Sequence, residues 1–231
     1  MEEKNQPNPS FLPLTIFVAA LLISGSILYS KFGDGNSRAL SANQPSRSAT
    51  QANLLASQTN LTDDDVVLGD PKAPVTMVIF GDYQCPFCGR MFQEVEGRLK
   101  EIYVKTGKLK MVYRDFPLDQ LHPYARTAAE MAECARDQGK YWAYHDALFN
   151  LQDQIPTLDF VTLAGQLGLD KNKFSACSQS GKYKAEVEKD YEDGLILGIN
   201  GTPTSFVNGE RLVGAQPYSA YQAAIEAALA K

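Results

Sequence analysis

Residues 75–89 read V-T-M-V-I-F-G-D-Y-Q-C-P-F-C-G, and the rest of the chain is organised around this stretch. The β-branched and apolar run at 75–80 predicts a buried strand. A short polar turn at 81–84 follows, and the motif C-P-F-C at 85–88 then opens a segment with helical periodicity. A Cys-x-x-Cys pair between a strand and a helix is typical of redox chemistry.

The two cysteines of this motif have different predicted roles. Cys85 takes the helix N-cap position, and Pro86 takes the first helical position, where a missing N–H costs nothing. The free N–H groups and partial positive charge of a helix start stabilise a thiolate, and such thiols have pKa values of about 3.5–7.5. Cys88 lies one turn further on, so we expect Cys85 to be the attacking sulfur and Cys88 the resolving one. Half a metal site and an inert disulfide are the alternatives.

Length and composition restrict the class of protein. The chain has 231 residues, a formal net charge of -5 and four cysteines. One domain with an appendage is expected, and the absence of a basic cluster argues against nucleic-acid binding. The sequence has no G-x-G-x-x-G motif, P-loop or repeat, so we expect no nucleotide cofactor. It also has no Met/His-rich tract, and we expect no metal. An even set of cysteines suits an oxidising compartment.

The N-terminal third divides into three predicted segments. Residues 1–10 form a polar tail, and residues 11–30 carry no charge over 20 positions, enough for a transmembrane signal-anchor helix. A cleaved signal peptide is the alternative. Residues 31–62 are rich in Ser, Asn, Gln and Ala, which predicts a flexible linker, and the globular domain spans 63–231. Flanking charges barely specify orientation, but the cysteines favour a single-pass cell-membrane protein with its domain on the extracytoplasmic side.

The domain continues with a predicted order of elements after the Cys-x-x-Cys helix. A second strand is expected at 109–113, parallel to the first. A helical block follows, then a long polar helix, a hairpin marked by Asn208-Gly209 and a closing amphipathic helix. Thr157 and Asp170 are predicted N-caps. The predicted helices are 123–136, 141–151, 158–167, 171–179, 182–197 and 217–229, and the hairpin strands are 204–207 and 210–213.

This order of elements resembles the DsbA-like thiol–disulfide oxidoreductases in their membrane-tethered form. The resemblance covers about residues 61–231 and implies a thioredoxin-like α/β fold with an inserted α-helical subdomain at about 118–182, preceded by one transmembrane helix. The motifs that carry it are D-Y-Q-C-P-F-C at 82–88, F-P-L at 116–118 with His122-Pro123, G-K-Y-W at 139–142, Y-H-D at 144–146, and G-I-N-G-T-P-T-S-F-V-N at 198–208.

The resemblance also implies a peptide-binding site around the cysteines. It makes the Thr202–Pro203 bond cis and places it opposite Cys-x-x-Cys, where the Thr202 backbone binds an extended peptide. A trans proline that only starts a strand is the alternative. Pro86 and Phe87 complete the predicted support of the site. Phe87 stands where the best-known member has histidine, and Ile79 where some relatives have a buried acid, so we expect a milder oxidant.

Three further polar residues have two interpretations each. Asp82 is the acid nearest the cysteines, either a turn or cap residue or a candidate for proton transfer. His122 precedes Pro123 and either caps the following helix or lies near the active face. His145 lies in an aromatic helical stretch, where a packed residue is expected in preference to a ligand.

Cys134 and Cys177 lie 43 positions apart and flank the helical block. We interpret them as a structural disulfide that would stabilise the fold by about 3–4 kcal/mol through chain entropy. Two free buried thiols and a second redox pair are the alternatives. A zinc site shared with Cys85 and Cys88 lacks the tight spacing of chelating pairs.

The sequence therefore predicts a protein disulfide oxidoreductase that works outside the cytoplasm through a Cys85–Cys88 disulfide. Its expected partners are extracytoplasmic thiol-containing proteins, secreted or in the membrane, and the resemblance implies a quinone-linked membrane partner that reoxidises it. We expect a monomer. The alternatives are a reductase or isomerase using the same residues, and a non-enzymatic module that binds peptides or a metal.

Overall fold

The computed structural model describes residues 64–231. Three predicted segments lie outside the described residues: the tail (1–10), the membrane span (11–30) and the linker (31–62). Within 64–231, none of the helices has both the length and the apolar character that crossing a membrane requires.

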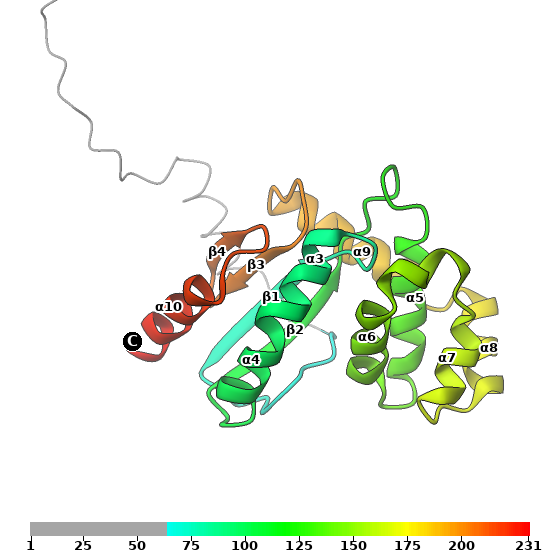
Figure 1. Cartoon of the computed structure of the whole chain (residues 1–231), viewed down its shortest axis with the longest axis horizontal. Helices are drawn as coiled ribbons and strands as arrows, with labels where there is room; N and C mark the ends of the chain where they lie inside the picture. The colour runs from blue at the N-terminus through cyan, green and yellow to red at the C-terminus, as the bar shows by residue number, and fades with distance from the viewer. Residues whose placement is uncertain (1–63) are drawn as a thin grey trace, which may run out of the picture. The chain divides into compact units, whose positions relative to one another are not determined.

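A four-stranded sheet in the order β2-β1-β3-β4 forms the centre of the domain (Figure 1). Strand β1 (Val75–Gly81) pairs in parallel with β2 (Leu109–Asp115), as predicted from the sequence. On its other side β1 pairs antiparallel with β3 (Thr204–Val207), which forms a hairpin with β4 (Glu210–Val213). The predicted edge strand before β1 is reduced to a single bridge between Leu68 and Met111.

The apolar run of β1 has both of its faces buried. Met77 and Ile79 belong to one hydrophobic cluster, while Val78 and Phe80 belong to a second cluster on the opposite face. Helix α10 (Tyr218–Leu229) contacts β1 and β3. A strand covered on both sides needs apolar residues at successive positions, which is why this segment reads as a continuous hydrophobic run.

A single helical segment follows the Cys-x-x-Cys motif and packs across the sheet. It begins as α3 (Pro86–Met91) and α4 (Gly97–Leu99), interrupted and followed by two turns of π-helix, η2 (Phe92–Glu96) and η3 (Lys100–Val104). Met91, Val95 and Leu99 are buried at four-residue spacing. Gly107 has a φ of 72° and allows the chain to turn toward β2.

The helical insertion lies between β2 and the hairpin, as predicted. Figure 1 shows its helices beside the sheet, and α9 contacts both α5 and β2. A disulfide between Cys134 and Cys177 joins α5 to α8. The elements are α5 (Ala125–Arg136), α6 (Tyr141–Asn150), the 3-10 turn η4 (Gln152–Thr157), α7 (Phe160–Gln166), α8 (Lys171–Ser180) and α9 (Lys184–Ile196).

One predicted helix cap is wrong. Thr157 ends η4, and α7 begins later, with Asp159 as its N-cap. The Asp159 carboxylate accepts a hydrogen bond from the backbone N–H of Thr162 at 2.9 Å. An aspartate that precedes a helix satisfies an orphan N–H group of the first turn, which is the role that was expected of the threonine. The predicted cap at Asp170 is confirmed, since its side chain accepts from the N–H groups of Asn172 and Lys173.

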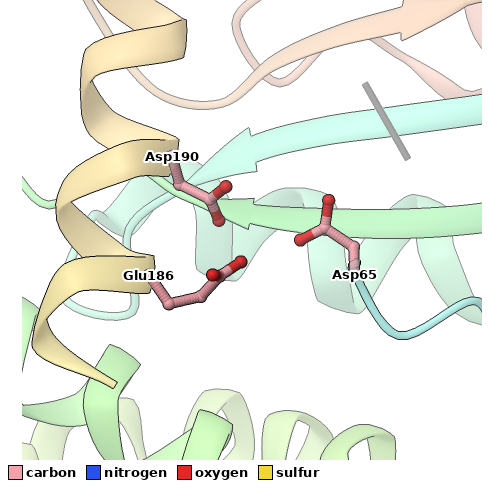
Figure 2. Close-up of side chains that lie close together, drawn as sticks. All are labelled: Asp65, Glu186 and Asp190. Carbon is pink, nitrogen blue, oxygen red and sulfur yellow. The ribbon is translucent and has the colours of Figure 1, made fainter. Parts of the chain in front are cut away.

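Acidic side chains gather where β2 ends against α9. Figure 2 shows the carboxylates of Asp65, Glu186 and Asp190 turned toward one another, and their oxygens lie within 4.8 Å. The fully buried Arg114 forms ion pairs with Asp65 at 3.4 Å and with Asp190. Its guanidinium supplies positive charge at the place where the acids meet, and without it their burial would be costly.

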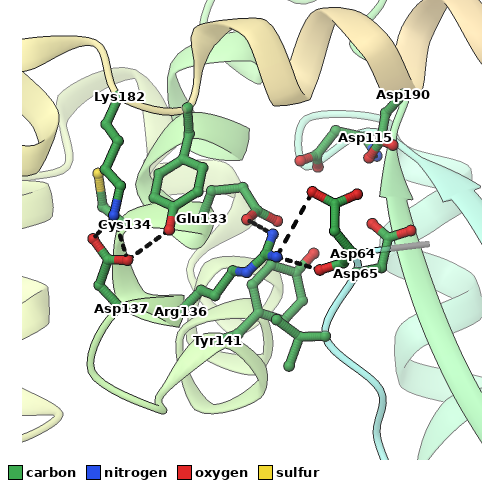
Figure 3. A network of polar contacts seen from close by, with 12 residues as sticks. Asp64, Asp65, Asp115, Glu133, Cys134, Arg136, Asp137, Tyr141, Lys182 and Asp190 are labelled. Carbon is green, nitrogen blue, oxygen red and sulfur yellow. Dashed lines mark hydrogen bonds and ion pairs between the residues drawn. The ribbon is translucent and has the colours of Figure 1, made fainter. Parts of the chain in front are cut away.

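The acidic region extends along α5 (Figure 3). Arg136 pairs with Glu133 at 3.0 Å and reaches Asp64, while Lys182 pairs with Asp137 at 2.7 Å. Burial raises the pKa of Glu133 to about 7 despite its pairing with Arg136. Burial likewise raises the pKa of Asp190 to about 6, although Arg114 opposes the shift. Both carboxyls therefore bind protons more tightly in the folded protein than in an unfolded chain.

Candidate active site

The Cys-x-x-Cys motif lies at the N-terminus of α3, directly after β1 and its turn. Cys85 is the N-cap residue in extended conformation, and Pro86 is the first residue of the helix. Cys85 and Cys88 are both unbonded and buried, with 4% and 3% of their surface exposed. The structure therefore represents the reduced pair, with Cys85 at the end of the helix that carries free N–H groups.

The surroundings of Cys85 stabilise its thiolate. Hydrogen bonding from the Cys88 thiol contributes most and lowers the pKa of Cys85 to about 6, against burial, which raises it. The Thr202 side chain and the backbone N–H groups of Phe87 and Cys88 lower the pKa further. At neutral pH the Cys85 sulfur is therefore mostly ionised, and the thiolate is the reactive form of cysteine.

Cys88 has the opposite chemistry. Burial raises the pKa of its thiol well above the ordinary value, and its hydrogen bond to Cys85 and the charge of the Cys85 thiolate raise it further. Cys88 therefore keeps its proton while Cys85 is ionised. This asymmetry makes Cys85 the exchanging sulfur and Cys88 the one that closes or opens the internal disulfide.

The loop before β3 lies against Cys85. The Thr202–Pro203 peptide bond is cis, and Cys85 Sγ lies 3.4 Å from the carbonyl oxygen of Thr202. Thr202 is 8% exposed, whereas Phe87 on the helix is 55% exposed. The cysteines are thus covered by the cis-proline loop on one side, and an exposed aromatic ring lies beside them.

Asp82 anchors the turn between β1 and α3. Its side chain is fully buried, and one carboxylate oxygen accepts from the backbone N–H groups of Gln84 at 2.7 Å and Cys85 at 3.1 Å. The other oxygen accepts from the N–H of Leu118 and lies 2.8 Å from Nδ1 of His122. The structure thus gives Asp82 the hydrogen bonds of a turn residue, while helix α3 itself has no side-chain cap.

Sequence reasoning missed Gln152, which holds the active-site turn from the helical insertion. Its side-chain amide donates to the carbonyl oxygens of Tyr83 at 2.8 Å and Cys85 at 3.0 Å. The position of Gln152 also explains why residue 89 is a glycine, because a side-chain carbon at that position would collide with the Gln152 amide. A glutamine 64 positions after Cys88 carries no local signal; only the glycine one residue past the motif hinted at a close approach.

His145 is a packed residue, as expected. It is fully buried, with Nδ1 3.1 Å from the Tyr83 hydroxyl and Nε2 3.5 Å from Glu96. Burial would raise the pKa of Glu96, but hydrogen bonding and attraction from His145 and Lys100 outweigh it and lower that pKa. His145 and Lys100 therefore both favour the ionised form of this buried carboxyl.

Asp65, Glu186 and Asp190 are the group of acids in residues 64–231 whose spacing would suit a cation. Arg114 already contacts two of them. None of the three belongs to the hydrogen bonds described around Cys85, so they are not part of the thiol chemistry.

Comparison with known proteins gives the family. A family model described as Thioredoxin matches residues 61–227, and the chain belongs to the thioredoxin family. The structure is similar to that of α-DsbA1 from Wolbachia pipientis, with a TM-score of 0.64 and 26% identity over 72% of this chain and 92% of that one. The chain is also 28% identical to the probable disulfide bond formation protein D of Bacillus anthracis, covering 86% of this chain and 87% of that protein.

A different kind of relative shares only its thioredoxin-like part. The chain is 36% identical over 168 residues to the Na(+)/H(+) antiporter NhaA 1 of Salinispora arenicola (strain CNS-205), covering 73% of this chain. It spans about a quarter of that relative's length, 25%. Taken together, the comparisons confirm the resemblance to DsbA-like oxidoreductases and the thioredoxin-like fold with a helical insertion.

Proposed function

We propose that the protein is a thiol–disulfide oxidoreductase that oxidises cysteine pairs of secreted or membrane proteins outside the cytoplasm. The observation that carries this proposal is the opposite ionisation of Cys85 and Cys88 beside the Thr202–Pro203 loop. A pair used only as a structural disulfide would need neither a stabilised thiolate nor a covering cis-proline loop.

The exchange begins with the oxidised pair. A substrate thiolate attacks Cys85 Sγ, the Cys85–Cys88 bond breaks, and its electron pair passes to Cys88, which takes up a proton because its pKa is raised. A second substrate thiolate then attacks the substrate sulfur of the mixed disulfide and releases Cys85 as a thiolate. The substrate loses two electrons and two protons; the protein keeps both electrons, with one proton on Cys88.

The direction of exchange follows from the stability of the released thiolate. A reduced form that is stabilised by a low Cys85 pKa makes the disulfide a stronger oxidant. With the pKa of Cys85 at about 6, the leaving thiolate is favoured at neutral pH. Phe87 adds no positive charge between the cysteines, and for this reason we propose an oxidant milder than the strongest members of the family.

The cellular setting belongs to the same proposal. We propose that residues 11–30 tether a monomeric domain to the outer side of the cell membrane, where reduced secreted proteins meet it. A quinone-linked membrane protein would then take the two electrons from the reduced pair. The similarity to DsbA1 and to a disulfide bond formation protein supports this setting.

Stoichiometric exchange with a reduced dithiol peptide tests the activity. The oxidised domain should convert the peptide to its disulfide, one per protein, and C85S should abolish the reaction. C88S, incubated instead with the disulfide form of the peptide, should form a mixed disulfide through Cys85, because the thiolate attacks the peptide disulfide and releases one peptide thiol. The C134S/C177S double variant should still exchange. If the wild-type domain binds a metal through Cys85 and Cys88 and oxidises no peptide, the proposal fails in favour of a metal-binding module.

A further inference from the structure

His122 and Asp82 form a pair directly beneath the active-site turn. Nδ1 of His122 lies 2.8 Å from a carboxylate oxygen of Asp82, whose side chain is fully buried. The histidine side chain is 18% exposed. The proposed thiol exchange does not use either side chain.

Asp82 contacts both members of the redox pair. Its carboxylate accepts from the backbone N–H of Cys85 at 3.1 Å. A hydrogen bond from the Asp82 backbone favours the Cys88 thiolate. It lowers the pKa of Cys88, although burial raises that pKa by more. Any change in the charge or orientation of Asp82 is therefore felt at both sulfurs.

A buried carboxylate in the turn that carries the thiolate is unfavourable unless hydrogen bonds satisfy it. Like charges in a poorly solvated site raise the pKa of the weaker acid, here the cysteine thiol. His122 is the basic side chain paired with Asp82, and the other three donors to the carboxylate are neutral backbone N–H groups, of Gln84, Cys85 and Leu118. The imidazole of His122 therefore supplies the side-chain contact of this carboxylate.

The structure also shows that the His122 side chain does not cap the helix that follows. Helix α5 begins at Ala125, its N-cap is Tyr124, and no side chain caps it. The backbone carbonyl of His122 accepts from the N–H of Ala125 at 3.1 Å, while the imidazole is directed to Asp82. The contact between His122 and Asp82 thus spans 40 positions of sequence and joins the loop after β2 to the active-site turn.

We propose that His122, acting through Asp82, is a positioning residue that stabilises the Cys85 thiolate. It holds the Asp82 carboxylate against the N–H of Cys85 through the contact between Nδ1 and the second carboxylate oxygen. The inference rests on the proposed thiol exchange at Cys85, because it concerns the reactivity of that sulfur.

A double-mutant cycle tests this, with the pKa of Cys85 as the readout, taken from the rate of iodoacetamide alkylation of the reduced protein. H122L should raise that pKa by about half a unit or more, because it removes the side-chain contact that holds the Asp82 carboxylate. The same change made in a D82N background should produce less than half of that shift, because the carboxylate that His122 positions is then absent. Q120L, an exposed position in the same loop, is the matched control and should not move the pKa.

A shift of less than half a unit with H122L overturns the inference. A shift in the D82N background that is at least half as large also overturns it, because His122 would then act independently of Asp82. If H122L does not fold, H122Q takes its place in the cycle with the same two thresholds. Alkylation needs no partner, so the cycle gives its answer even if the wild-type protein oxidises no peptide and the proposed function fails.

Discussion

Cys85 and Cys88 are identical side chains three positions apart, yet the fold gives them opposite acid–base behaviour. Cys85 lies at the helix start, where hydrogen bonding from Cys88 lowers its pKa to about 6. Cys88 lies one turn deeper, where burial raises the pKa of its thiol. A local position on a helix thus decides which sulfur reacts with another molecule.

Removing the Cys88 thiol should make Cys85 less acidic. Because hydrogen bonding from Cys88 is the largest cause that lowers the pKa of Cys85, we expect C88A to raise that pKa by about one unit. The midpoint of the alkylation rate against pH measures it. A midpoint that stays at about 6 in C88A would show that the helix start and Thr202 are enough to lower the pKa of Cys85.

Gln152 should stabilise the active-site turn through its two hydrogen bonds. Truncation in Q152A leaves the carbonyl oxygens of Tyr83 and Cys85 without this donor, and we expect the free energy of unfolding to fall by about 1–2 kcal/mol. Urea denaturation of the reduced protein measures the change. Q93A alters an exposed glutamine of η2, in the helical segment that follows the cysteines, and should have almost no effect. Equal losses in the two variants would refute the role of Gln152.

At this scale the sequence predicted what local chemistry determines. The N-cap position of Cys85 and the proline after it follow from helix rules, and the structure has both. The contacts of Gln152 and His122 with the turn could not be predicted, because each depends on how a distant segment packs. A pattern in one segment contains no information on which side chain another segment brings to it.

At the scale of elements, most helices and strands follow the hydrophobic periodicity. Both hairpin strands have the predicted bounds, 204–207 and 210–213, because Asn208-Gly209 specifies the turn. The predicted helix after the cysteines is present, but its two π-helical turns were not predicted. A π-helical turn contains more residues than an α-helical turn. The hydrophobic periodicity of so short a segment does not reveal this difference.

The Cys134–Cys177 disulfide should stabilise the helical insertion. It closes a loop across a sequence separation of 43, so the C134A/C177A variant should lose about 3–4 kcal/mol of folding free energy by the chain-entropy model. Urea denaturation with Cys85 and Cys88 blocked by alkylation measures it. Unchanged stability would mean that the unfolded chain gains little conformational freedom when the disulfide is removed. Loss of peptide oxidation in a variant that still folds would indicate a redox role for this pair instead.

At the scale of the whole molecule, the buried acids between the sheet and the insertion make stability depend on pH. The folded pKa values of about 7 for Glu133 and about 6 for Asp190 lie above those of an unfolded chain. The folded protein therefore binds more protons between about pH 4.5 and 7, and its stability falls as the pH rises through this range.

The replacement E133Q should weaken this dependence. A neutral side chain needs no proton to be buried, so we expect the wild-type thermal midpoint to fall between pH 5 and pH 8, and E133Q to fall less. The loss due to Glu133 alone is on the order of 1–3 kcal/mol. Thermal unfolding of the oxidised protein at both pH values gives the comparison, with E94Q, at an exposed acid, as control. An equal fall of the thermal midpoint in the wild type and in E133Q would contradict the assignment of this pH dependence to Glu133.

The reduction potential of the Cys85–Cys88 couple tests the central claim most directly. Equilibration of the domain in glutathione buffers, followed by quantification of the oxidised fraction, gives this value. A stabilised Cys85 thiolate in the reduced form predicts a potential more positive than about −220 mV, as an oxidant of secreted proteins requires. A potential at or below about −220 mV, within the range of the reducing cytosolic glutathione pool, would contradict the oxidase and indicate a reductase.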